Sequence, residues 1–342
     1  ADMWRREETK LKNDKDAKRV FLKNDKAYRV GEIHKQEQLA DTLETIAKNG
    51  REGFYGGYVA DDIVNKVKKL GGNLTQEDLI NFQAEYVNPI KIDYNGYEVY
   101  ECPPNGQGIV ALMMLNMLSN INFTKYDPSD YRRIHIEAEV SKLAFLHRNK
   151  YLGDPKFSDI PVEKMLSKDY GLYLSQKINE TSVLQNLNIK KLENNKDTVY
   201  ISIVDNKGNF VSLINSIFHP FGSGKVTENT GILLHNRGAS FNLDNNHPNF
   251  FAASKKPMHT IIPGLLMKNN KPIMPFGVMG AHYQPVGQTH FLTNVLDYGM
   301  DVQMALDHSR SFYYENQLIL EKSISLESFD KLQKLGHKVN YC

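Results

Sequence analysis

The stretch at residues 196–224, KDTVYISIVDNKGNFVSLINSIFHPFGSG, decides the fold that we expect for this chain. Residues 199–204 alternate with the period of a β-strand, and residues 210–217 form a second apolar-rich strand. Residues 205–209 between them, DNKGN, are typical of a tight turn in which the glycine adopts a positive φ. The pattern therefore predicts a β-hairpin, followed by a glycine loop at residues 221–224.

The composition excludes several classes of protein. The chain has 342 residues, a formal net charge of +2, 41% hydrophobic and 24% charged residues, which is typical of a globular protein with a substantial core. The near-neutral charge argues against a nucleic-acid partner. No uninterrupted apolar run is long enough to span a bilayer. The two cysteines, Cys102 and Cys342, form neither a disulfide framework nor a metal cluster.

Elsewhere the sequence predicts helices at the ends of the chain and strands in its centre. We expect residues 1–30 to be a solvated helix end and loop, and the charged segments 190–197 and 242–249 to be exposed loops. Expected helices span residues 36–48, 53–70 (followed by a Thr75-x-x-Asp78 cap), 109–118, 131–151, 165–178, 280–298, 301–309 and 325–335. Expected strands lie within residues 89–100 around Asn95-Gly96, at 231–235, and at 261–267 and 272–278.

These patterns closely resemble the γ-glutamyltranspeptidase family of N-terminal-nucleophile hydrolases. The matching residues are DTVYISIVDNKGNFVS, SIFHPFGSG and GILLHNRGASF, with QEQLADTLETIAKNG, FYGGYVA, GGNLTQEDL and AFLHRNKYLGDP before them. The resemblance implies an α+β fold, the four-layer α/β/β/α sandwich of that class. It also implies that residues 1–197 are the C-terminal portion of a large, mainly helical subunit, and residues 198–342 a small subunit, together one intertwined domain. Because the family's front segment is not recognisable here, we expect an internal portion of a longer protein.

The resemblance makes Thr198 the nucleophile and the bond between Asp197 and Thr198 the site of self-cleavage. Taken alone, a threonine here would be an ordinary strand starter. A threonine hydroxyl needs a base to accept its proton before it attacks. Cleavage would give Thr198 a free α-amine, whose pKa is about 7.7–8.0 in short peptides. That amine could accept the proton directly or through one water, so nucleophile and base would come from one residue.

Three further residues are predicted to support this chemistry. The family's oxyanion hole is a Gly-Gly pair, which aligns with Gly280-Ala281; the backbone N–H survives the change to alanine, and we expect the hole to persist if φ of Ala281 is negative. Without the resemblance this segment would be a plain strand-to-helix turn. Ser216 occupies the position of a threonine whose hydroxyl binds the amine of the nucleophile, and serine keeps that hydroxyl.

The predicted substrate-binding residues depart from the family pattern. Members hold the free α-amine of a γ-glutamyl group with an acid in a QMDDF loop, whereas residues 237–241, RGASF, contain none. Arg237 could pair with a carboxylate, or it could equally be an ordinary surface or ion-pair arginine. The carboxylate-binding Ser-Ser pair of the family aligns with His259-Thr260, where Thr260 keeps a hydroxyl and His259 adds a potential cation.

The missing acid suggests a substrate without a free α-amine. Inside poly-γ-glutamate the α-nitrogen is an uncharged amide, while every residue keeps its α-carboxylate. Arg237 and His259 suit this polyanion better than glutathione. The chain therefore most resembles the capsule depolymerase (CapD-type) branch of bacilli, which cleaves poly-γ-glutamate and transfers it to peptidoglycan. The resemblance implies a γ-glutamyl substrate, an amine or water acceptor, and a secreted or envelope-attached enzyme.

Other hypotheses stay open at this stage. The NRG loop and the GxMGxxxQPxG stretch also occur in acylase-like relatives, so a β-lactam side-chain (cephalosporin-type) acylase is an enzymatic alternative. A non-catalytic scaffold or binding remnant is a second alternative from a different class. The sequence predicts no cofactor. His135 and Glu139, four residues apart on a predicted helix, could ligate a metal, but no obvious third ligand accompanies them, so we expect no metal site.

Overall fold

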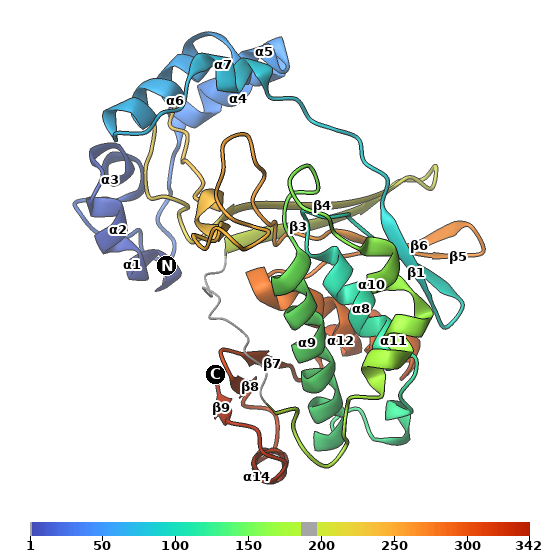
Figure 1. The fold of residues 1–342 in the computed structure, drawn as a ribbon. Coiled ribbons are helices and arrows are strands. Elements are labelled where there is room, and N and C mark those ends of the chain that lie inside the picture. Colours follow the sequence, from blue (N-terminus) through green and yellow to red (C-terminus); the bar gives the residue numbers. More distant parts are fainter. Residues whose placement is uncertain (1, 186–196) are drawn as a thin grey trace. The chain divides into compact units, whose positions relative to one another are not determined.

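The computed structural model describes residues 2–185 and 197–342, and the chain divides into two compact units (Figure 1). Unit 1 comprises Ala1–Tyr86 and Ile217–Arg237, and unit 2 comprises Val87–Ser216 and Gly238–Cys342. Each unit contains residues from both sides of Thr198. The two units are therefore spatial divisions, and the predicted large and small subunits at residues 1–197 and 198–342 stay a prediction.

Unit 1 is built from helices and loops. Its helices are α1 (Asp2–Arg6), α2 (Glu8–Lys12), α3 (Lys15–Phe21), α4 (Glu37–Asn49), α5 (Glu52–Tyr55), α6 (Gly57–Lys69) and α7 (Gln76–Asn81). α4 confirms the helix predicted at residues 36–48. The helix predicted at residues 53–70 is instead two helices, because Gly56 leaves the helical conformation and Gly57 has a φ of +59°. α7 begins with the predicted capping box of Thr75 and Asp78.

The expectation for residues 1–30 is wrong, because this segment forms a core of its own. Leu11, Ala17, Phe21 and Leu22 are buried together with Val226 from the second segment of unit 1. The many charges that suggested a solvated segment are partly used inside the unit. The ammonium of Lys66 on α6 is buried between the carboxylates of Asp14 and Asp16, at 2.7 and 2.9 Å.

The strand predicted at residues 231–235 is also wrong, since only an isolated bridge between Val226 and Leu233 forms there. Next to this segment, a side chain accepts backbone hydrogen bonds of the kind that a neighbouring strand accepts in a sheet. The carboxylate of Asp62 accepts hydrogen bonds from the backbone N–H groups of Asn229 and Thr230, each at 2.8 Å. These two backbone groups, which precede the predicted strand, are therefore paired with a side chain.

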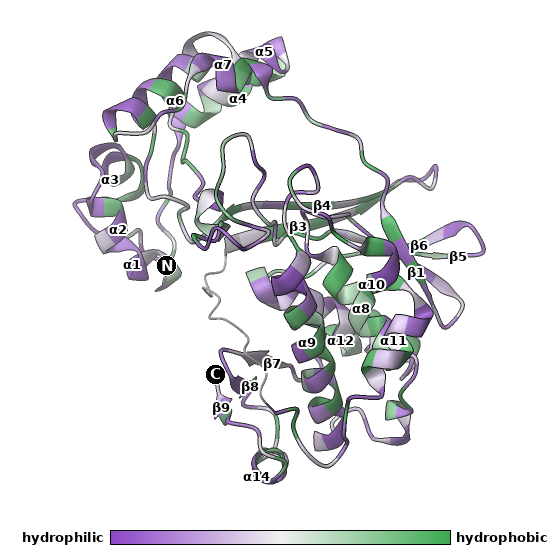
Figure 2. Cartoon of the chain, in the orientation of Figure 1, coloured by the Kyte–Doolittle hydropathy of each residue, from purple (hydrophilic) through white to green (hydrophobic). Residues whose placement is uncertain are grey.

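Unit 2 is organised around a four-stranded antiparallel sheet. The strands are β1 (Ile90–Tyr94), β2 (Tyr97–Glu101), β5 (Gly264–Lys268) and β6 (Lys271–Phe276), in the order β1-β2-β5-β6. They confirm both predicted strand pairs, with turns at Asn95-Gly96 and Asn269-Asn270. Helix α8 (Gly108–Leu118) is buried along its whole length and contacts β1 and β2 (Figures 1 and 2). A helix that is apolar on every side belongs in the centre of a core.

Further helices surround α8. α9 (Tyr131–Tyr151) has the predicted bounds and contacts α8, as does α12 (Gln284–Leu296). The helix predicted at residues 165–178 is two helices, α10 (Val162–Leu166) and α11 (Lys168–Ser175), because Ser167 leaves the helical conformation and caps α11 through the N–H of Tyr170. No helix among the described residues combines the length and apolar character that a bilayer span requires.

The predicted hairpin is confirmed as β3 (Asp197–Val204) and β4 (Phe210–Phe218), and β3 contacts β6 of the main sheet. Helices and sheets thus pack in layers, which confirms the α+β sandwich. The predicted loop at residues 190–196 lies outside the described residues. One face of the hairpin is apolar and exposed: Val199, Ile201 and Ile203 are 55%, 41% and 52% exposed.

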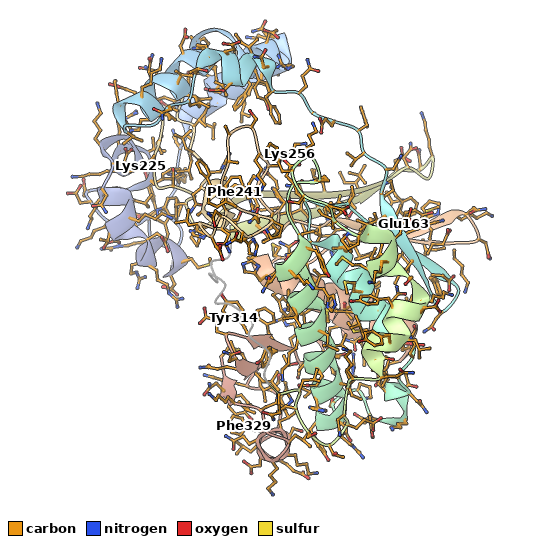
Figure 3. The ribbon with its side chains drawn as sticks, viewed as in Figure 1. Glu163, Lys225, Phe241, Lys256, Tyr314 and Phe329 are labelled. Carbon is orange, nitrogen blue, oxygen red and sulfur yellow. The ribbon has the colours of Figure 1, made fainter. Side chains whose placement is uncertain are left out.

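The C-terminal part of unit 2 carries a small sheet that the sequence did not predict. It contains β7 (Ser311–Tyr314), β8 (Gln317–Leu320) and β9 (Val339–Tyr341), with β8 and β9 parallel. Helices α13 (Val302–Asp307) and α14 (Leu326–Lys334) confirm the two predicted late helices. Tyr314 on β7, labelled in Figure 3, stacks on Phe312 and joins the core around α8.

Candidate active site

Thr198 and Ser216 are brought together by the hairpin, as the sequence predicts. Thr198 is the second residue of β3, and Ser216 lies near the end of β4. The Oγ1 hydroxyl of Thr198 donates to Oγ of Ser216 at 3.4 Å, a long hydrogen bond. The nucleophile candidate therefore has a second hydroxyl beside it, fixed by the pairing of two strands.

Tyr200 connects the same hairpin to the loop that contains Gly280. Its hydroxyl lies 3.2 Å from Oγ of Ser212, and Ser212 donates to the carbonyl of Phe276 at the end of β6. The ring of Tyr200 covers Gly277, where an added Cβ would lie 2.4 Å from the ring. Gly277 therefore allows the hairpin to approach the start of residues 277–281 closely.

The turn at Gly280-Ala281 has an unusual backbone. Gly280 has a φ of +128° and Ala281 a φ of +48°, and the 3-10 helix η3 (Ala281–Tyr283) leads from here into α12. The condition under which we expected the oxyanion hole to persist, a negative φ at Ala281, is therefore not met. Alanine in the left-handed region costs roughly 1–2 kcal/mol, so the surrounding contacts must hold this turn in place.

Gln107 supplies such a contact, and the sequence analysis missed it. This side chain is fully buried just before α8, and its Nε2 amide donates to the carbonyls of Ala281 and Thr260, both at 2.9 Å. The N–H of Gln107 also donates to the carbonyl of His259. One residue therefore holds the predicted oxyanion turn and both predicted carboxylate-binding residues. A glutamine between two glycines before a helix, in PPNGQG, is the signal that could have indicated it.

Gln107 is held in turn by Arg148 of α9. Nη1 of Arg148 donates to Oε1 of Gln107 at 2.9 Å and lies 3.0 Å from Nδ1 of His282. Burial lowers the pKa of Arg148 to about 9, so the guanidinium remains charged at neutral pH. Arg148, which lies in the AFLHRNKYLGDP stretch, thus orients the amide that donates to Ala281 and Thr260.

Glu101 is a buried acid beside this network. It ends β2 and is 1% exposed, and neither carboxyl oxygen has a donor in hydrogen-bonding geometry among the described residues. Burial raises the pKa of Glu101 well above its usual value, and the nearby N–H of Cys102 offsets this only in part. Burial also raises the pKa of Tyr200, and the Glu101 carboxylate adds to that rise.

Arg237 belongs to unit 1 and is described by its own surroundings. It is 6% exposed, which contradicts a surface role, and its guanidinium lies 4.4 Å from the centre of the Phe218 ring. Burial lowers the pKa of Arg237 to about 10, so it too stays charged at neutral pH. A charged guanidinium over an aromatic ring is stabilised by the ring electrons.

The expectation that His135 and Glu139 lack a third metal-ligating neighbour is wrong. His337, far along the chain, lies beside both of them in unit 2. Sequence spacing could not indicate this neighbour, because the pairing of β8 with β9 brings it there.

The hairpin thus places Thr198 at the start of one strand and the Ser216 hydroxyl opposite it on the next, and β3 contacts β6, which precedes the turn at Gly280-Ala281. The sequence profile of γ-glutamyltranspeptidase matches residues 1–341, so the chain belongs to the γ-glutamyltranspeptidase family. This confirms the family resemblance and does not test the capsule depolymerase branch.

Relatives and solved structures agree with this assignment. The chain is 37% identical to the glutathione hydrolase-like YwrD proenzyme of Bacillus subtilis (strain 168), across 94% of this chain and 61% of that protein. It is 31% identical to the glutathione hydrolase proenzyme of Escherichia coli (strain K12), across 96% of this chain and 60% of that protein. The crystal structure of cephalosporin acylase from Bacillus halodurans matches with a TM-score of 0.90 and 38% identity, covering 99% of this chain and 63% of that one. The chain thus spans about three fifths of the length of these proteins.

Proposed function

We propose that the protein is a self-processing, threonine-dependent acyl transferase or hydrolase that acts on γ-glutamyl amide bonds. The observation that carries the proposal is the hydrogen bond between Oγ1 of Thr198 and Oγ of Ser216 at the start of the hairpin, in a chain of this family. The names of the relatives, glutathione hydrolase proenzymes, support both the substrate class and the cleavage of a precursor.

The proposed chemistry begins when the hydroxyl of Thr198 attacks the carbonyl of Asp197 and water opens the resulting ester. The freed α-amine of Thr198 then accepts the proton from Oγ1 as that oxygen attacks the γ-carbonyl of the substrate. We place the oxyanion hole for the negative oxygen at the N–H groups of Gly280 and Ala281, although φ of Ala281 is positive and the condition set from the sequence is not met. The amine of the substrate takes the proton and leaves, and water or another amine releases the acyl group from Thr198.

Trapping the acyl group with hydroxylamine tests this proposal. Hydroxylamine attacks the ester on Thr198 and gives a γ-glutamyl hydroxamate. Full-length wild-type protein should form the hydroxamate from a γ-glutamyl anilide, whereas the Thr198→Ala variant should not. Equal hydroxamate yields from both proteins would show that Thr198 does not carry the acyl group. Binding of the substrate without turnover in the wild type would favour the scaffold hypothesis.

We further propose poly-γ-glutamate as the substrate, with the chain released or transferred to an amine of the cell wall. The support is the absence of an acid in residues 237–241 together with the buried charge of Arg237. A desolvated guanidinium attracts a carboxylate more strongly than an exposed one does. A secreted or envelope-attached location would follow from this substrate. Faster turnover of poly-γ-glutamate than of glutathione is the expected result, and the reverse preference would refute it.

A cephalosporin-type acylase is the second candidate, favoured by the similarity to the Bacillus halodurans acylase. Both candidates use the same acyl transfer and differ in the group that is bound. Parallel assays with a γ-glutamyl anilide and an N-acyl cephem distinguish them. Hydrolysis of the cephem amide alone would replace the γ-glutamyl proposal with this one.

A further inference from the structure

A group of metal-ligating side chains lies in unit 2, in the contact between α9, the residues after α14, and residue 179. His135 and Glu139 project from successive turns of α9, and His337 lies between α14 and β9. α14, which carries the labelled Phe329, contacts α9 (Figure 3). One ligand atom from each of the three residues lies within 4.8 Å of the others, and all three side chains are buried.

His135 presents its nitrogens in the way that metal-binding histidines do, and Nε2 of His337 donates a hydrogen bond to it. Nε2 of His135 lies 2.7 Å from the carbonyl of Asn179, so this nitrogen carries the proton and Nδ1 presents its lone pair. Nδ1 of His135 lies 2.8 Å from Nε2 of His337. A histidine whose remote N–H is bound to a backbone carbonyl has its tautomer and ring orientation fixed, which is the usual support of a metal ligand.

Glu139 supplies the third donor and is held in a similar way. Its Oε2 accepts a hydrogen bond from the N–H of Leu184 at 2.6 Å, while Oε1 faces the histidines, 3.9 Å from Nε2 of His337. One carboxylate oxygen is therefore used for orientation and the other is directed into the cluster. Nδ1 of His337 is buried with no hydrogen-bond partner among the described residues.

Lys142 occupies part of the same space. Its ammonium donates to Oε1 of Glu139 at 2.5 Å and lies 4.3 Å from the centre of the Tyr313 ring. The positive charge of Lys142 compensates the negative charge of the buried Glu139 carboxylate, as a bound metal ion would. A metal at this position would displace the ammonium from Glu139, and the proton on Nε2 of His337 would move to Nδ1. Lys142 thus competes with a metal, which makes it the informative residue to change.

We propose that His135, Glu139 and His337 form a binding site for a divalent transition metal of the Zn²⁺ type, with Lys142 as the competing cation. Two imidazoles and one carboxylate are ligands that zinc takes in tetrahedral sites, with water as the fourth. The ligands come from α9 and from the chain just before β9. A bound metal would tie the C-terminal sheet to the centre of unit 2, apart from Thr198 and its chemistry.

Metal titration of the full-length, chelator-treated protein tests the proposal. Co²⁺ is added first, because its visible absorption reports tetrahedral coordination, and Zn²⁺ is then measured by competition with a chromophoric chelator. We expect one metal per chain. Loss of an outer-shell partner lowers metal affinity by about 10–100-fold, so loss of a ligand in His337→Gln or Glu139→Gln should lower it by at least about 100-fold. Lys142→Met should raise the affinity by about tenfold or more.

A matched control is His147→Gln on the same helix. His147 is bonded to the carbonyl of Leu143 and the hydroxyl of Tyr170, and no part of it belongs to the cluster. The metal affinity of the His147→Gln variant should equal that of the wild type. Equal weakening in His147→Gln and His337→Gln, or no binding in both wild type and Lys142→Met, would overturn the proposal. Because Lys142→Met is expected to bind the metal more tightly than the wild type, a variant that merely fails to fold cannot give this result.

Discussion

Replacing Gln107 by methionine should damage both folding and catalysis, because this side chain connects three parts of unit 2. Methionine has a similar shape and fills the same space, but it provides neither the amide donors nor the carbonyl. The variant loses the hydrogen bonds from Nε2 to Thr260 and Ala281 and the bond that Oε1 accepts from Arg148.

The cost can be worked out from the groups that are left behind. A buried polar group without a partner costs about 1–3 kcal/mol. The carbonyl of Ala281 keeps the N–H of Gln284, and Nη1 of Arg148 keeps His282, so the loss there is partial. We therefore expect Gln107→Met to lower the free energy of unfolding by about 2–3 kcal/mol. Displacement of the Ala281 turn by a fraction of an ångström to 1 Å should lower kcat by about 10²-fold.

Two measurements separate these effects. Chemical denaturation gives the free energy of unfolding, and release of a coloured aniline from a γ-glutamyl anilide gives kcat and KM. Gln303→Met is the matched control, because Gln303 is exposed and its side chain, among the described residues, donates to the exposed Asp307; it should change stability by less than about 0.5 kcal/mol. Gln107→Glu keeps the acceptor for Arg148 but places a carboxylate oxygen against the carbonyls of Thr260 and Ala281, so it should not recover kcat. A Gln107→Met variant with wild-type kcat would refute the positioning role.

Three more changes give clear expectations. Since burial raises the pKa of Glu101 well above 4.5, the unfolded chain releases this proton at lower pH than the folded protein, so Glu101 lowers stability as the pH rises above about 4.5. Glu101→Gln should therefore be more stable than wild type at pH 8 in thermal melts, by about 1.4 kcal/mol for each unit by which the pKa of Glu101 differs between the folded and unfolded protein. This difference in stability should disappear near pH 4, and a difference that stays constant with pH would contradict the expectation. Gly277→Ala places a Cβ against Tyr200 and should lower the free energy of unfolding by about 1–3 kcal/mol in chemical denaturation. The loss should exceed that of Gly208→Ala, where φ is +78° but the space is open, and the opposite order would contradict the expectation. Ala281→Gly should relieve the φ of +48° and stabilise the protein by about 1 kcal/mol with kcat retained, and a lower kcat would show that the alanine methyl contributes to the site.

Local sequence patterns predicted most elements of the fold because their signals are short in range. The bounds of α9, the Thr75–Asp78 capping box and the hairpin at β3 and β4 follow from periodicity and turn residues. The sequence failed where burial depends on distant partners. In the charged segment at residues 1–30, two acids pair with the distant Lys66, and just before residues 231–235 the N–H of Thr230 donates to the distant Asp62.

The candidate site shows the same division. The family resemblance was enough to pair Thr198 with Ser216, whereas the role of Gln107 depends on three segments that only tertiary structure brings together. The φ of Ala281 could not be derived either, because alanine ordinarily avoids the left-handed region and is held there by its neighbours. His337 became a neighbour of His135 through a strand pairing that has no local signal.

The central claim is that Thr198 becomes an N-terminal nucleophile, and intact mass spectrometry tests it most directly. Full-length wild-type protein and the Thr198→Ala variant are purified side by side, and their masses are measured without digestion. We predict two fragments in the wild type, divided between Asp197 and Thr198, and one uncut chain in the variant. An uncut wild type would leave Thr198 without a free amine, and a variant cut at the same bond would show that its hydroxyl does not perform the cleavage; either result would contradict the claim.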